Sequence, residues 1–356
     1  MQRFGLLSAA GISILGLIGF AGAQQTPASG PYKVLRTAKV GGAGGFDYVF
    51  ADSGGRRLYI PRGGTPGTPP GPGRVAVFNL DTLAPVGEIP NSSARGAAVD
   101  PKSGHGFGSS KPVVMWDAKT LATMKTIDVE GGPDGILFDP FNQRVYVFSH
   151  RAPNATVINA VDGSVVGTID LGGAPEQAVS DEKGHLYVDI EDKANVAVID
   201  AKTMTVTAHY DLTGKGGTPA GLAFDAKNRI LFVACRTPAP GVMVMLNADN
   251  GKVLATLPLA GGSDGAVFNP ATMEAFSSAG NGTLTVIKEE SPASFVVEQN
   301  VETMQSAKTL TLDGKTNHIL LIGAEFGPPP TPAPAGGRPG RGPMIADSFS
   351  ILVVGK

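Results

Sequence analysis

The feature that most constrains this chain is a unit of about forty residues that recurs along most of its length. The clearest copy, residues 131–171, contains four short apolar runs, each about as long as a β-strand. β-branched and aromatic residues fill the runs, and Gly, Pro, Asn and Asp separate them. One copy is therefore expected to fold as a four-stranded antiparallel meander. Such a sheet has two apolar faces, so it must pack against further copies.

Seven copies align on the residue that ends the first strand of each unit. That residue is an acid or its amide followed by a turn, and it occurs at Asp52, Asp100, Asp139, Asp181, Asp225, Asn269 and Asp313. The copies start 39 to 48 residues apart. Four strands in a repeat of roughly 40–45 residues are the WD40-like period of propeller blades. The sequence thus predicts an all-β fold, a seven-bladed β-propeller of four-stranded antiparallel blades.

The two ends of the chain are expected to complete one blade together. The seventh copy supplies three strands, the last at residues 348–354, and then the chain ends. An apolar segment at residues 32–40 precedes the first copy. Pairing these two segments would close the ring and remove exposed strand edges. The Gly- and Pro-rich stretch at 327–344 is predicted to be a long surface loop of this blade, because a complete strand follows it.

The first 23 residues have the organisation of a secretory signal peptide. Arg3 gives a positive start, residues 4–20 are apolar, and residues 21–23 match an A-x-A cleavage site. Cleavage would leave 24–31 as a flexible mature N-terminus and 32–356 as a single propeller domain without a membrane span. The alternative is an uncleaved anchor, since roughly 17 apolar residues approach the lower limit for a span. We expect a bacterial protein that is periplasmic or secreted.

Composition limits the classes of partner. The net charge of −2 gives no general attraction to nucleic acid or anionic membranes. Gly (49) and Pro (28) are abundant while 42% of residues are apolar, which favours a turn-rich β protein over a disordered chain. The single cysteine, Cys235, cannot form an internal disulfide, so we expect core packing to hold the fold. We also expect the protein to be a monomer. The single tryptophan, Trp116, is expected to pack between the second and third blades.

In a propeller, the residues just before the first strand of each blade surround one mouth of the central channel. This position is ionisable in every copy but the fifth: Asp47, Arg95, Asp134, Glu176, Ala220, Asp264 and Lys308. The acids Asp47, Asp134, Glu176 and Asp264 are candidate ligands of a divalent cation, and oxygen donors suit a hard cation such as calcium. Alternatively, each acid only accepts hydrogen bonds from the backbone of its own turn. No other cofactor is predicted.

The residues that follow the second strands should lie on the same face. They include Arg62, His150 with Arg151, Cys235 with Arg236, and Glu325. Arginines at equivalent places suit recognition of a carboxylate or a phosphate, although exposed arginines can also simply solvate a rim. The predicted ligand- or partner-binding surface therefore comprises Asp47, Arg62, Arg95, Asp134, His150, Arg151, Glu176, Arg236, Asp264, Lys308 and Glu325.

One subset of this surface suits acid–base chemistry. His150 could face Asp134 one loop away, and together with Glu176 and Arg151 it forms the predicted catalytic group, should the protein be an enzyme. Cys235 is either a thiol nucleophile or a small buried apolar residue. No His neighbour of Cys235 is evident in the sequence, which favours burial.

Several phrases of the repeat match a known type. They are Gly-Gly-x-Asp-Gly at 131–135 and 261–265, Arg-Val-Tyr-Val at 144–147, His-Leu-Tyr-Val at 185–188 and Val-Ala-Val-Ile-Asp at 196–200. Through them residues 32–356 resemble the YVTN-type β-propeller repeat of the YncE-like group. The resemblance weakens in copies two and six, where Phe107-Gly108 and Ala275-Phe276 replace Tyr-Val, and in the third strand of copy seven. It implies an exported binding-type protein, often without an assigned reaction, and fold alone implies no more.

Three classes of function follow from these features. The first is a binding protein whose channel-mouth face recognises a protein, peptide or cell-envelope ligand. The second is an enzyme, either a lactonase-like hydrolase or a redox propeller, with its polar site at the mouth. The third is a structural repeat that only spaces other components, which would have no well-formed pocket at the mouth.

Overall fold

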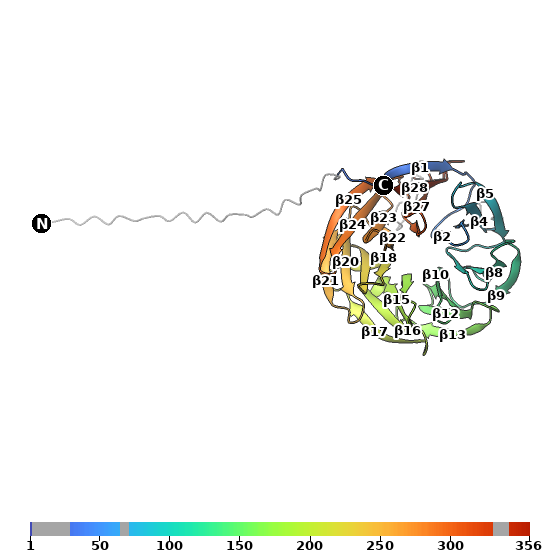
Figure 1. The fold of residues 1–356 in the computed structure, drawn as a ribbon, viewed down its shortest axis with the longest axis horizontal. Coiled ribbons are helices and arrows are strands. Elements are labelled where there is room, and N and C mark those ends of the chain that lie inside the picture. The colour runs from blue at the N-terminus through green and yellow to red at the C-terminus, as the bar shows by residue number, and fades with distance from the viewer. Residues whose placement is uncertain (2–28, 65–70, 330–341) are drawn as a thin grey trace.

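The computed structural model describes residues 1, 29–64, 71–329 and 342–356. These residues form seven four-stranded antiparallel sheets, arranged as blades around a central channel (Figure 1). The prediction of a seven-bladed β-propeller is confirmed. The predicted signal peptide lies outside the described residues except for Met1, as does most of the predicted mature N-terminus. Within the described ranges, the structure contains no helix with the length and apolar character needed to cross a membrane.

Blades 1 to 6 are each built from four consecutive strands. Blade 1 comprises β2 (Phe50–Asp52), β3 (Arg57–Arg62), β4 (Arg74–Asn79) and β5 (Pro85–Pro90). Blade 2 comprises β6 (Ala97–Asp100), β7 (His105–Gly108), β8 (Val113–Asp117) and β9 (Thr123–Ile127). Blade 3 comprises β10 (Pro133–Asp139), β11 (Arg144–Ser149), β12 (Asn154–Asn159) and β13 (Val165–Asp170). The first strand of each blade lies beside the channel and the fourth at the rim (Figure 1).

The next three blades follow the same plan. Blade 4 comprises β14 (Pro175–Ser180), β15 (His185–Ile190), β16 (Asn195–Asp200) and β17 (Thr205–Asp211), with a short 3-10 helix, η1 (Glu191–Lys193), after β15. Blade 5 comprises β18 (Gly217–Asp225), β19 (Ile230–Thr237), β20 (Val242–Asn247) and β21 (Val253–Pro258). Blade 6 comprises β22 (Ser263–Asn269), β23 (Glu274–Ala279), β24 (Thr283–Ser291) and β25 (Ser294–Glu302).

Blade 7 is completed by the two ends of the chain, as predicted. It contains β26 (Leu310–Asp313), β27 (His318–Gly323), β28 (Ser350–Gly355) and β1 (Lys33–Lys39), and β1 pairs with β28. In this pairing Val34 lies opposite Val354 and Thr37 opposite Leu352. The segment before β1 also reaches blade 6, because the Tyr32 ring packs on Phe276 at 5.2 Å between centroids. The terminal strand therefore joins two blades while it removes an open edge.

The core lies between neighbouring blades. Tyr146 and Phe148 of β11 pack with Leu186 and Val188 of β15, and all four are buried. The second strand of a blade is apolar on both faces because a neighbouring blade covers each face. The outer strands are exposed, as Val165 in β13 illustrates with 49% exposure.

Trp116 occupies a different interface from the one expected. It lies in the cluster between blades 1 and 2, with its ring centroid 5.8 Å from that of Tyr59 in β3. Gly106, its partner across β7 and β8, leaves the space for the indole, since a Cβ there would overlap the ring. The prediction of blades 2 and 3 was wrong because strand spacing does not show to which side of its sheet a residue points.

The feet of the two Gly- and Pro-rich loops lie side by side on blades 1 and 7. Phe46 bridges Arg62 at the base of the blade-1 loop, and Phe326 bridges Met344 at the base of the loop predicted at 327–344. The rings of Phe46 and Phe326 are 6.5 Å apart. Residues 65–70 and 330–341 of these loops lie outside the described residues. The paired base at Phe326 and Met344 returns the chain to its own blade.

Candidate functional site

Equivalent β-bulges aim the first-strand residues into the channel mouth. The strand register shifts between Pro133 and Ile136 in blade 3, and between Pro175 and Ala178 in blade 4. The same shift occurs at the starts of β18 and β22. A bulge opposes two residues to one on the partner strand and redirects a side chain. Asp134, Glu176, Ala220 and Asp264 lie within these four bulges, which explains why the sequence position maps to the mouth.

Small residues let the inner strands approach each other at the mouth. A Cβ on Gly135 would lie 2.9 Å from the carbonyl oxygen of Glu176 on the next blade. A Cβ on Gly221 would lie 2.7 Å from the backbone of Gly265. The glycine that follows the mouth residue in the repeat therefore serves close backbone packing, which brings the polar side chains together.

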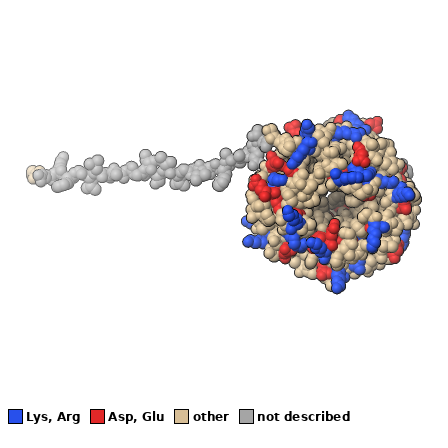
Figure 2. Space-filling model, viewed as in Figure 1, with Lys and Arg blue, Asp and Glu red and all other residues tan. Residues whose placement is uncertain are grey.

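The polar side chains at the mouth form a closed circle that passes through all seven blades. Acids and bases alternate around it in the order Asp134, Arg95, Asp47, Lys308, Asp264, Arg236, Glu191 and His150. Among the described residues, no backbone N–H donates to the carboxylates of Asp47, Asp134 or Asp264, so these acids do not cap their own turns. Figure 2 shows side chains of both signs around the central hollow of the ring.

Basic side chains bridge the acids of this circle, which we call the charge ring. Arg95 lies 3.2 Å from Asp47 and 3.5 Å from Asp134. Lys308 lies 3.0 Å from Asp47 and also contacts Asp264. Burial alone would lower the pKa of Lys308, but the charges of Asp264 and Asp47 raise it above its usual value. The ring lysine therefore stays charged.

Two further residues, Arg236 and His150, complete the charge ring across blades 3 to 6. Arg236 contacts both Asp264 and Glu191. His150 lies between two acids, with Nε2 3.2 Å from Glu191 and Nδ1 3.9 Å from Asp134. The imidazole thus has a carboxylate beside each ring nitrogen.

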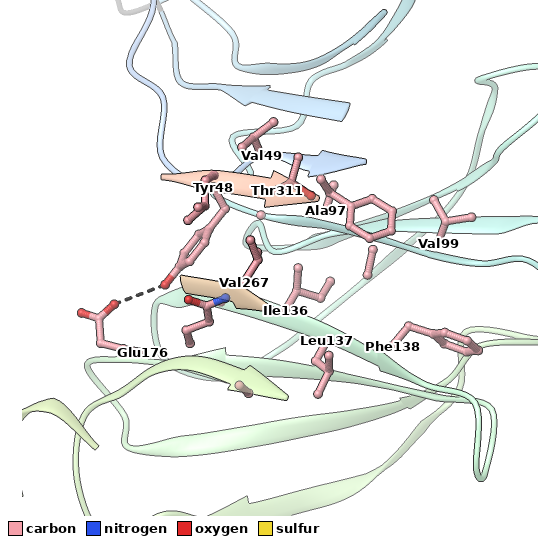
Figure 3. Close-up of a pocket in the computed structure, with 17 residues that line it drawn as sticks. Tyr48, Val49, Ala97, Val99, Ile136, Leu137, Phe138, Glu176, Val267 and Thr311 are labelled. Atoms are coloured by element: carbon pink, nitrogen blue, oxygen red, sulfur yellow. Dashed lines mark hydrogen bonds between the residues drawn. The ribbon is translucent and has the colours of Figure 1, made fainter. Parts of the chain in front are cut away.

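Glu176 lies beside the charge ring and forms no ion pair with any of the residues that the structure describes, although the charge of Arg236 acts on it. The hydroxyl of Tyr48 donates a hydrogen bond of 3.2 Å to its Oε2 atom (Figure 3). Burial, followed by the charges of Asp134 and Glu191, raises the pKa of Glu176 to about 8. One oxygen or nitrogen atom each of Asp134, His150 and Glu176 lies within 4.8 Å of the other two. The predicted catalytic group therefore converges in three of its four members.

Beneath Glu176 lies an acid that the sequence did not single out. Asp189, in β15, is fully buried, and neither of its carboxylate oxygens has a hydrogen-bond partner among the described residues. Burial, followed by the charge of Glu176, raises its pKa well above the usual value. Cys235 is buried beside it, and burial also raises the pKa of that thiol. Cys235 thus packs as a small apolar residue, the alternative that the sequence favoured.

Two cavities lined by described residues lie along the channel. One of about 260 Å³ lies below the mouth and is lined by Tyr48, Glu176 and apolar residues such as Ile136 (Figure 3). A second, of about 630 Å³, lies at the opposite mouth and includes Lys183. Gln177 borders both, and its side-chain amide hydrogen-bonds to the backbone of Leu222 and Ala266 on two other blades. A small ligand at the charge ring would therefore lie above a largely apolar cavity that Gln177 helps to line.

Arg62 is not part of the mouth surface, which corrects its assignment as a ligand contact. Its side chain is 98% buried, since only 2% of its surface is exposed. The guanidinium donates to the carbonyl oxygens of Gly42 and Gly44 and stacks on the Phe349 ring at 3.6 Å. Burial lowers its pKa to about 10. Arg62 therefore holds the base of the blade-1 loop against blade 7.

The remaining predicted residues lie on the mouth face outside the charge ring. Arg151 is exposed, packs its methylenes over Gly132, and has no hydrogen bond or ion pair with any described residue. Glu325 is half exposed, 3.8 Å from Lys39. Glu325 also borders a groove of about 720 Å³ between blades 6 and 7.

Three residues of the site were missed from the sequence: Tyr48, Asp189 and Glu191. Glu191 follows β15 as His150 follows β11, so the register of the repeat would have found it. Asp189 occupies the place of the buried Phe148 in blade 3, and an acid at an apolar repeat position is a visible signal. Nothing in the repeat marks Tyr48.

The chain was also compared with known proteins. No family model matches it, and no curated protein matches it. It is similar to a chain of the solved "Crystal Structure of Mitotic Checkpoint Complex", with 10% identity, a TM-score of 0.69, and 87% of this chain and 95% of that chain covered. It is likewise similar to "Structure of U3-55K", with 13% identity, a TM-score of 0.69 and coverage of 92% and 99%.

A third similar structure is titled "Crystal structure of RRP9 WD40 repeats", with 13% identity, a TM-score of 0.68, and 93% of this chain and 99% of that chain covered. At these identities the likeness shows the fold alone. The YncE-like resemblance therefore stays a prediction, whereas the chain has the fold of a WD40-like β-propeller.

Proposed function

We propose that this chain is an exported binding protein that recognises a protein, peptide or cell-envelope ligand at its channel-mouth face. The observation that carries the proposal is the convergence of polar side chains from all seven blades on one mouth, above a cavity of about 260 Å³. Pockets that combine an apolar lining with a few convergent polar groups are typical binding sites. A protein that only spaces other components would need neither the convergent polar side chains nor the cavity.

Arg151 supplies an exposed cation on this face. Its guanidinium is exposed and unpaired among the described residues, whereas Arg95 and Arg236 are held by acids. A free guanidinium pairs with carboxylate or phosphate through two parallel hydrogen bonds. Ligands with a carboxylate, such as the peptide part of cell-wall fragments, therefore suit this surface.

The test is a thermal-shift screen with soluble peptidoglycan fragments, on the wild type and two charge-reversal variants. Arg151→Glu changes the mouth face, and Lys183→Glu changes the opposite mouth as a matched control. We expect a fragment that stabilises the wild type to stabilise K183E equally and to lose its effect on R151E. At one hundred times its dissociation constant a ligand adds about 2.7 kcal/mol. If the fragment still raised the melting temperature of R151E but not that of K183E, the binding site would lie at the opposite mouth.

Export is the second part of the proposal and rests on the signal-peptide pattern of residues 1–23. Expression of the full chain in a bacterial host should yield a periplasmic or secreted protein that begins at Gln24. Intact-mass measurement of the envelope fraction checks this. A full-length mass in the membrane fraction would instead support the uncleaved anchor.

A second candidate function is a lactonase-like hydrolase, and one observation favours it. Asp134, His150 and Glu176 lie within reach of a common substrate atom, as an acid or base must. Hydrolysis of a simple lactone by the wild type, lost in Glu176→Gln with unchanged melting temperature, would establish it. Equal rates in wild type and variant would remove this group from consideration as a catalyst.

A further inference from the structure

We propose that Asp134, His150 and Glu176 bind one divalent first-row transition-metal ion, such as zinc, at the channel mouth. This proposal rests on the proposed function, because it adds a metal ion to the channel-mouth face that is proposed to bind the ligand. One ligand atom from each residue lies within 4.8 Å of the others. A tetrahedral ion with bonds of about 2.1 Å holds its ligand atoms about 3.4 Å apart, so ligand atoms up to 4.8 Å apart need to approach each other by up to about 1.4 Å. His150 is about one-third exposed and has room to move.

The carboxylate of Asp134 is buried and unsatisfied. Its side chain is 9% exposed, and its buried Oδ1 atom accepts no hydrogen bond from any described residue. Arg95 lies 3.5 Å from Oδ1 without hydrogen-bond geometry, and Oδ2 faces His150. A buried carboxylate with an unsatisfied oxygen costs free energy, which a cation bound to this carboxylate would recover. This observation is independent of the clustering of the three residues.

His150 has a carboxylate beside each ring nitrogen, and the one beside Nε2 is the kind of neighbour that orients a metal-ligating histidine. Its Nε2 atom lies 3.2 Å from Glu191, while Nδ1 faces Asp134. A carboxylate that accepts the N–H of one ring nitrogen fixes the tautomer and leaves the other nitrogen free to bind metal. Arg236 in turn contacts Glu191 and holds it in place. The partner that orients the ligand is thus itself held from a neighbouring blade.

Glu176 is supported in the same way. Tyr48 donates a hydrogen bond to Oε2, which leaves Oε1 for a metal. Behind it lies the buried Asp189, and neither of its carboxylate oxygens has a hydrogen-bond partner among the described residues.

The donor set selects the class of metal. Calcium takes six to eight oxygen ligands, whereas one imidazole with two carboxylates suits zinc and its neighbours. Asp47 and Asp264 are the other two acids that the sequence predicts as cation ligands. Both form ion pairs with Lys308 rather than with the group of Asp134, His150 and Glu176. Three protein ligands leave at least one coordination position open to water or to a ligand carboxylate.

The experiment is a calorimetric titration of the EDTA-treated full chain with ZnCl₂, and separately with CaCl₂, at pH 7.5. We expect one zinc site per chain, at least tenfold tighter than calcium. His150→Ala and Glu176→Gln should each weaken zinc binding at least tenfold. Glu191→Gln, which removes only the orienting carboxylate, should weaken it by about 10–100-fold.

Two control variants address adventitious binding. His209→Ala removes an exposed histidine of β17, and Glu325→Gln removes a half-exposed carboxylate of the mouth face. Both should bind zinc within about twofold of the wild type. Loss of the site in H209A, or zinc affinity unchanged in H150A, would overturn the proposal. The proposal would also be overturned if calcium and zinc bound with equal affinity and neither affinity changed in H150A.

A measurement on the wild type alone covers variants that fail to fold. X-ray absorption at the zinc edge should show one imidazole in the coordination shell, and a shell of oxygens only would contradict the proposal. Because the titration uses metal alone, its failure is distinguishable from failure of the proposed function. Fragment binding that depends on Arg151 can hold without a metal, and a metal can bind without any fragment.

Discussion

Lys308 of blade 7 places its Nζ atom 3.0 Å from a carboxylate oxygen of Asp47 in blade 1 and also contacts Asp264 in blade 6. One ammonium thus joins three blades at the point where the two ends of the repeat array meet. Its side chain is about one-quarter exposed, so water screens these pairs only in part. The mouth is therefore both a polar site and a clasp between blades.

Replacing this lysine should destabilise the ring. Lys308→Met leaves two partly buried acids without their shared cation, and we expect a loss of about 1–3 kcal/mol in the free energy of unfolding. Lys252→Met, at an exposed position without an ion pair among the described residues, is the control and should change stability by less than about 0.5 kcal/mol. Urea denaturation measures both. Equal effects would mean that the charge ring does not clasp the blades.

The packing of blade 7, which closes the ring, gives a second prediction. Leu352 lies on β28 opposite Thr37 and is 3% exposed, so Leu352→Ala should cost about 2–5 kcal/mol. Leu35 on β1 is 41% exposed, and Leu35→Ala should cost less than about 1 kcal/mol. Chemical denaturation compares them. A small loss in L352A would show that the ring does not depend on the packing of β28 against blade 6.

Glu289 predicts a pH dependence of stability. Burial raises its pKa to about 7, and Asn228 donates a 2.6 Å hydrogen bond to Oε1. The unfolded chain releases this proton near the usual value, so between about pH 4.5 and 7 the folded state binds more protons. This contribution to stability is full at low pH and is lost as pH rises through 7.

The variant Glu289→Gln isolates that contribution. Gln keeps the acceptor for Asn228 and cannot ionise, so the variant should lose less stability than the wild type between pH 5 and pH 8. Urea midpoints at the two pH values give the difference. Parallel losses in the two proteins would show that Glu289 ionises in the folded state as it does in the unfolded chain.

Substitution of Arg62 should lower the stability of the fold, whereas substitution of Arg151 should leave it nearly unchanged. Arg62→Ala leaves glycine carbonyls without their donor and removes the stacking on Phe349, which should cost about 2–4 kcal/mol. Arg151→Ala should change stability by less than about 0.5 kcal/mol, because its side chain is exposed and unpaired among the described residues. Thermal melts measure both. A destabilised R151A with an unaffected R62A would reverse these roles.

The repeat register is the reason that so much of the fold could be predicted. The acid or amide that ends each first strand marks one copy, and a copy cannot bury its faces alone, so the number of copies gives the number of blades. The same register placed Asp134 and Glu176 at one mouth, because equivalent positions of equivalent blades share a face. Trp116 shows the limit of this reasoning, since register does not say which neighbouring blade a side chain contacts.

The sequence by itself determined the seven blades, the pairing of the two chain ends and the face on which the polar residues gather, because these depend on strand period and on local turns. The tertiary structure alone decided which acid meets which base. It paired Lys308 with Asp47, oriented His150 through Glu191, left Asp134 and Asp189 unsatisfied, and buried Arg62. The physical reason is that charge pairing depends on distances of a few ångströms between blades far apart in the chain, which no local pattern encodes.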